Sequence, residues 1–158
     1  VSTVEAGQGF RDSGTAASIK PASLARDGAG NLFVSDSGNN IILKVTSARA
    51  ISVIAGSGYG SGDGVGKSAH FRAPSGLTID STDTNLYAGE STGHRVRKIV
   101  IASGEVTTLA GSGTGASTDG TGTGAAFNRP RGIVIDPTNT NLYVAEFTGK
   151  KIRKMKEY

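Results

Sequence analysis

The feature that most constrains the fold of this chain is an internal repeat written three times. Pro21, Pro74 and Pro130 lie 53 residues (74−21) and 56 residues (130−74) apart. Other residue types recur in the same register, namely Asp27, Asp80 and Asp136, then Asn31-Leu32-Phe33, Asn85-Leu86-Tyr87 and Asn141-Leu142-Tyr143. A repeat of this period predicts copies of one supersecondary unit, each burying its apolar flanks against its neighbours. We place the units at about residues 1–50, 51–105 and 106–158 of a single segment, 1–158.

Each unit reads as short β-strands. In the third unit GIVID alternates apolar positions, NLYVAE follows a turn-rich segment, and KIRKM comes next, while VTTLAG leads into a long glycine loop. The 24 glycines fit strands joined by tight turns better than helices. The sequence therefore predicts an all-β fold with four strands per unit, which at this period is typical of a β-propeller blade.

At family level, AFNRPRGIVIDPTNTNLYVAEFTGKKIRKM and HFRAPSGLTIDSTDTNLYAGESTGHRVRKI resemble NHL repeats. The resemblance rests on a proline before the first strand, an aspartate ending it, an aromatic in the second strand, and then an acidic residue (Asp36, Glu90 or Glu146). It covers essentially the whole chain and implies three four-stranded blades of an NHL-type β-propeller. The first unit departs from the pattern, with Arg26 where the others have Ile79 and Ile135.

Three blades alone would leave two blade faces and several strand edges in water. The chain begins on VSTV, which matches ISVI at 51 and VTTL at 106, and it ends after a third strand, so the last blade lacks a fourth. Two chains could close a six-bladed ring as a homodimer, each lending its first strand to the other's last blade. Alternatively the chain is part of a longer propeller, or it stacks into a filament.

The rim loops are the expected place for recognition, because the strands are committed to packing. The candidates for partner binding are Phe10, Arg26, Tyr59, Arg72, Arg129 and Arg131. In the glycine loops, Asp12, Asp63 and Asp119 are read as Asp-Gly turns, with calcium binding as the minor alternative.

The repeated acidic residues are expected to be structural. Asp27, Asp80 and Asp136 each precede a turn whose amides an aspartate can accept. Asp36, Glu90 and Glu146 each lie four residues before a turn position, Asn40, His94 or Lys150, which predicts a repeated hydrogen bond or ion pair within each blade.

Composition narrows the function. A net charge of +4 favours anionic partners, but the basic residues follow third strands without interleaved aromatics, which makes nucleic acid an unlikely partner. There is no cysteine, no apolar run long enough to span a membrane, and no nucleophile and base at a recognisable spacing.

We expect a non-enzymatic scaffold that binds a protein or glycan and needs no cofactor. A self-assembling ring or filament, and half of a metal-dependent lactonase- or lyase-like propeller, are the alternatives. The glycine-, serine- and threonine-rich loops favour a secreted or surface protein.

Overall fold

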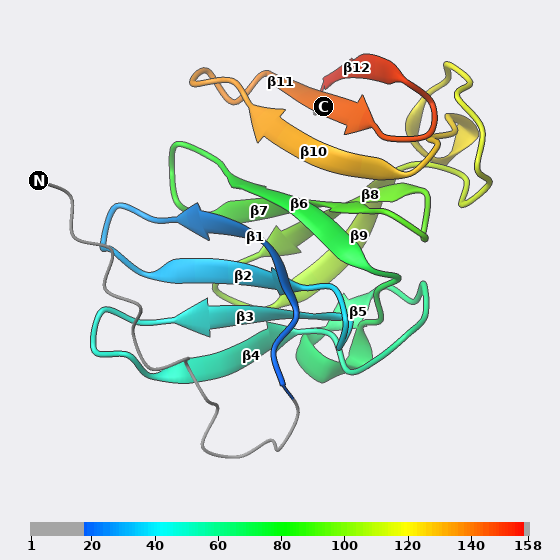
Figure 1. Cartoon of the computed structure of the whole chain (residues 1–158). Helices are drawn as coiled ribbons and strands as arrows, with labels where there is room; N and C mark the ends of the chain where they lie inside the picture. The colour runs from blue at the N-terminus through cyan, green and yellow to red at the C-terminus, as the bar shows by residue number, and fades with distance from the viewer. Residues whose placement is uncertain (1–17, 157–158) are drawn as a thin grey trace, which may run out of the picture.

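The chain is an all-β protein in the computed structural model, which describes residues 18–156 (Figure 1). Twelve strands and two short 3-10 turns, η1 (Gly66–Ser68) and η2 (Gly122–Gly124), follow one another. The strands are β1 (Pro21–Arg26), β2 (Leu32–Asp36), β3 (Ile41–Val45), β4 (Ile51–Ala55), β5 (Gly64–Val65), β6 (Pro74–Ile79), β7 (Asn85–Glu90), β8 (Arg95–Val100), β9 (Glu105–Ala110), β10 (Pro130–Ile135), β11 (Asn141–Glu146) and β12 (Lys151–Lys156). Within the described residues, no helix is long and apolar enough to cross a membrane.

The strands form three antiparallel sheets in chain order. The first is β1-β2-β3-β4, the second is β6-β7-β8-β9 with the short β5 on its outer edge, and the third is β10-β11-β12. This confirms the predicted all-β fold built from a repeated strand meander. The first sheet takes its outer strand, β4, from the start of the second sequence unit, and the second sheet takes most of β9 from the start of the third, so these two sheets straddle a unit boundary.

The sheets pack face to face with their first strands adjacent, so that β6 lies beside both β1 and β10 (Figure 1). Phe33 and Ile42 of the first sheet are fully buried against Leu86 and Ile99 of the second. The next junction is built around Val96, Phe127 and Val144. Apolar side chains therefore point to both faces of the middle sheet, as expected of a blade between two neighbours.

Short turns follow β1, β6 and β10 at one end of the molecule, and long loops follow β4 and β9 at the other (Figure 1). In the second turn, Asp80 accepts hydrogen bonds from the Thr84 amide at 2.8 Å and from the Asn85 side chain at 2.8 Å. Although burial pushes the pKa of Asp80 upward, these bonds outweigh it and hold the pKa below its usual range. Asp27 and Asp136 bond their own turns in the same way, which is the local use expected of them.

Candidate functional site

A buried arginine ties each long loop to the sheet that follows it. In the second sheet, the Arg97 guanidinium contacts Glu90 Oε1 at 3.0 Å and Asp63 Oδ1 at 2.7 Å. It also donates to the loop carbonyls of Gly62 and His70, and stacks on Phe71. Glu90 and Arg97 are fully buried, so these bonds replace most of their hydration, while Glu90 Oε2 and Arg97 Nε have no hydrogen-bond partner.

The third sheet repeats this arginine cluster contact for contact. Arg153 pairs with Glu146 at 2.8 Å and with Asp119, donates to the carbonyls of Thr118 and Ala126, and stacks on Phe127. The first sheet has Leu43 at the matching position and lacks the cluster. The cluster is thus a property of two of the three repeats.

These contacts correct the expected partners of the repeated acids. Glu90 and Glu146 pair with an arginine seven residues later, rather than with a turn residue four residues later, because that arginine is the diagonal neighbour of the acid on the same face of the hairpin and its long side chain spans the gap. Asp36 bonds Asn39, three residues on, through both the amide and the side chain. Asp63 and Asp119 are likewise loop anchors for arginine rather than simple turn residues.

Metal binding has no donor cluster to support it in the described part of the chain, where no three His, Cys, Asp or Glu side chains gather. Asp63 is engaged by Arg97 and by the Thr108 amide and hydroxyl, at 3.1 and 2.9 Å. Burial pushes the pKa of Asp63 upward, but the Thr108 bonds and the Arg97 charge outweigh it and keep the pKa low. Asp12 lies outside the described residues.

The two arginine clusters differ at one serine, which lines a pocket in the second sheet's cluster. Ser117 donates to Glu146, whereas its counterpart Ser61 accepts from Arg95 Nη1 at 3.2 Å instead. Glu90 Oε2 is consequently buried without a hydrogen-bond partner. Burial raises the pKa of Glu90 above its ordinary value, although the Arg97 charge opposes this.

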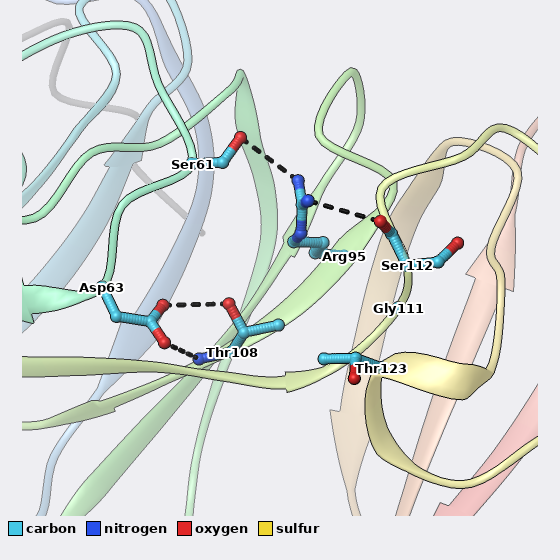
Figure 2. Close-up of a pocket in the computed structure, with 7 residues that line it drawn as sticks. All are labelled: Ser61, Asp63, Arg95, Thr108, Gly111, Ser112 and Thr123. Carbon is cyan, nitrogen blue, oxygen red and sulfur yellow. Dashed lines mark hydrogen bonds between the residues drawn. The ribbon is translucent and has the colours of Figure 1, made fainter.

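The pocket lies on the rim between the two long glycine loops and has a volume of about 470 Å³ (Figure 2). Its lining consists of Ser61, Asp63, Arg95, Thr108, Gly111, Ser112 and Thr123. Arg95 reaches into it between the loops and donates to Ser61 Oγ and to the Ser112 carbonyl at 3.4 Å. Its hydrogen bonds go to neutral acceptors, the Ser61 hydroxyl and the carbonyls of Gly93 and Ser112, while the Glu90 carboxylate interacts with its charge at longer range.

The residues proposed from sequence for partner binding do not line this pocket. Tyr59 is exposed and Arg72 stacks on it, while Arg131 stacks on the exposed Phe147 with 3.8 Å to the ring centroid. Arg129 is exposed with its amide bonded to His94, Arg26 is exposed at the end of β1 near the opposite rim, and Phe10 lies outside the described residues.

One nucleophile and base that the sequence spacing did not reveal do approach each other. Ser57 Oγ lies 3.5 Å from His70 Nε2, at the limit of a hydrogen bond. No carboxylate in residues 18–156 bonds the His70 ring, so the third member that orients the base in a catalytic triad is missing from this pair.

Comparison with known proteins places the chain in a family. No family model matches it. It is 31% identical over 142 residues to NHL repeat-containing protein 2 of Bos taurus. The matched region covers 83% of this chain and 20% of the bovine protein. A structural genomics protein of unknown function from Bacteroides thetaiotaomicron superposes with a TM-score of 0.71 at 33% identity, over 79% of this chain and 32% of the other.

A second solved structure, an auxiliary nutrient binding protein from Bacteroides thetaiotaomicron, superposes with a TM-score of 0.73 at 24% identity. It covers 83% of this chain and 36% of that one, and it supports the fold alone. The repeated sheets and these matches together define the class as an NHL-type β-propeller. The chain belongs to the NHL-repeat family and spans about a fifth of the length of its curated relative.

Proposed function

We propose that the chain is a non-catalytic binding module that holds an anionic, hydroxyl-rich ligand, such as an acidic glycan, in the rim pocket around Arg95. The observation that carries this proposal is a guanidinium in a pocket of about 470 Å³ that is hydrogen-bonded by neutral acceptors and makes no close ion pair. An arginine so placed keeps its preference for a carboxylate, which can accept two parallel N–H bonds from it.

The rest of the lining supports a ligand rich in hydroxyl groups. Ser61, Thr108, Ser112 and Thr123 carry hydroxyls that both donate and accept, and they come from both long loops and from β9. The net charge of +4 favours the approach of anions. A structural neighbour is named a nutrient binding protein, which supports the use of this fold for binding.

The pocket is positioned by the arginine cluster beneath it. Asp63 joins the two, since it contacts Arg97 in the cluster and Thr108 on the pocket wall. The loop that carries Ser61 is therefore fixed to the second sheet before any ligand arrives, and this limits the entropy lost on binding.

Isothermal titration calorimetry with trigalacturonate, and with the neutral trisaccharide cellotriose as the comparison, tests the proposal. We expect the acidic sugar to bind and Arg95→Gln to weaken it by about 10- to 100-fold, the worth of a charge-assisted hydrogen bond. Arg26→Gln removes the same charge near the opposite rim and should leave binding unchanged. Equal binding of both sugars, equal loss in both variants, or no binding at millimolar sugar would overturn the proposal.

A further inference from the structure

The third sheet presents a face that its two predecessors bury. Ile42, Val96 and Ile152 occupy the same register position, each paired with the residue just before the acidic residue that ends the preceding strand. Ile42 and Val96 are fully buried by the next sheet, but Ile152 is 79% exposed. Val134 and Phe147 beside it are also exposed.

Two hydrogen bonds, which we call polar links, join each sheet to the next, one at the long-loop end and one at the short-turn end. The third sheet lacks the group that it would contribute to each link. At the long-loop end, Asn40 Oδ1 accepts from the Ala73 amide at 2.8 Å and His94 Nδ1 accepts from the Arg129 amide at 3.2 Å. The matching residue of the third sheet is Lys150, whose side chain cannot accept a hydrogen bond.

At the short-turn end, the amide of Gly28 donates to Asp83 at 2.8 Å, and the amide of Ser81 donates to Asn139 at 2.9 Å. The matching residue of the third sheet is Pro137, which has no N–H to donate. If a sheet like the second or third packed on the third sheet, two of its groups would find no protein partner. These are the amide that matches those of Ala73 and Arg129, and the side-chain acceptor that matches those of Asp83 and Asn139.

The first sheet lacks the complementary halves. The residue that matches Ala73 and Arg129 is Lys20, whose amide already donates to Asp36 of its own sheet at 3.2 Å. The residue that matches Asp83 and Asn139 is Gly30, which has no side-chain acceptor. A first sheet placed on the third therefore gives up neither link, whereas a second or third sheet placed there would have to replace both protein hydrogen bonds with bonds to water.

The outer edge of the third sheet fits the same occupant. β3 and β8 each pair with an outer strand, but no strand between residues 18 and 156 pairs with the outer edge of β12. Residues 1–7, VSTVEAG, share the pattern of ISVIAG at 51–56 in β4 and VTTLAG at 106–111 in β9. The segment that precedes the first sheet thus has the sequence of an outer strand, and an outer strand is what β12 lacks.

We propose that the third sheet of one chain docks the first sheet of a second copy, while residues 1–7 of that copy pair with β12. The exchange is mutual, so two identical junctions close one ring from two chains of three sheets each. The exposed Leu24 of the first sheet becomes covered in the same step. This assembly is independent of the proposed ligand, because the Arg95 pocket lies within one chain.

Light scattering on the full chain after size exclusion, at about 50 µM, tests the assembly. We expect twice the 16.0 kDa mass of one chain. Ile152→Lys puts a charge into the junction and should give monomers, whereas Val65→Lys makes the same change at another exposed strand position and should leave the dimer intact. A wild-type monomer, an open series of larger species, or equal effects of both variants would overturn the proposal.

Engineered cysteines test the geometry even if Ile152→Lys fails to fold, because the chain has no cysteine of its own. Pro137→Cys combined with Ala29→Cys places one thiol on each side of the short-turn link. We expect the oxidised double variant to run as a covalent dimer on non-reducing gels, and each single variant to remain uncrosslinked. A ladder beyond the dimer would indicate a filament, and absence of crosslinking in the double variant would refute the arrangement.

Discussion

The substitution Arg97→Met tests how much the fold depends on the buried arginine cluster. The variant removes the guanidinium that contacts Glu90 at 3.0 Å and leaves that carboxylate fully buried without its charge partner. Breaking one side of a buried pair costs about 3–5 kcal/mol, because the remaining charge stays desolvated. Asp63 adds little to this cost, since its side chain is 49% exposed and can be hydrated again.

Thermal denaturation followed by circular dichroism at fixed protein concentration measures the effect. At roughly 2–4 °C per kcal/mol for a chain of this size, the melting temperature should fall by about 6–20 °C. The double variant Glu90→Gln with Arg97→Met should recover part of this loss, because it no longer buries a lone charge. A loss below about 1 kcal/mol, or a double variant no more stable than Arg97→Met, would refute the reasoning.

Three further predictions concern other parts of the molecule. Arg153→Met should cost less than Arg97→Met in the same melting assay, roughly 1–3 kcal/mol, because the buried Glu146 keeps its hydrogen bond from Ser117 and the Arg153 side chain is already 12% exposed; an equal or larger cost would contradict this. Gly76→Ala should be strongly destabilising, because a Cβ there would lie 2.2 Å from the Arg131 carbonyl oxygen, whereas Gly124→Ala, where a Cβ would meet nothing within 4 Å, should melt like the wild type; similar melting of the two variants would count against the packing described. The free energy of unfolding should fall as the pH drops below about 4, because the pKa values of Asp63, Asp80 and Asp136 are lowered in the folded state. Their stabilisation is present above the ordinary pKa of 3.8 and is lost below it, while the raised pKa of Glu90 opposes the trend. Urea titrations should show a shallower fall in Asp80→Asn, and an unchanged slope would argue against this origin.

The strands of the three sheets could be predicted from the sequence, because the same strand pattern recurs three times. The Asp80 turn and the alternation in GIVID are local signals, and the structure places both as expected. The arginine cluster was missed because its members are far apart in sequence and look like surface charges. The signal was nevertheless present, since Asp63, Glu90 and Arg97 recur at identical spacing as Asp119, Glu146 and Arg153.

The pocket could not be predicted, because it depends on how two glycine loops fold over the sheet. Gly111 and Gly113 adopt φ angles of 104° and 87°, which turn the loop back toward Arg95. A Cβ on Gly113 would lie 2.4 Å from the Arg95 guanidinium, and the φ of 87° disfavours any side chain, so another residue there would strain the loop and displace the arginine. Nothing in the spacing of Ser61 and Arg95 predicts that the serine turns away from Glu90 to contact that arginine.

A nuclear magnetic resonance titration of the isotope-labelled protein with trigalacturonate tests the binding function most directly. The account predicts saturable shifts of the Arg95 side-chain Nε–H and of the Thr108 amide, both at the pocket wall, with no shift of the Arg26 side chain near the opposite rim. Saturable shifts confined to residues outside the pocket, or no saturable shift at all, would contradict it.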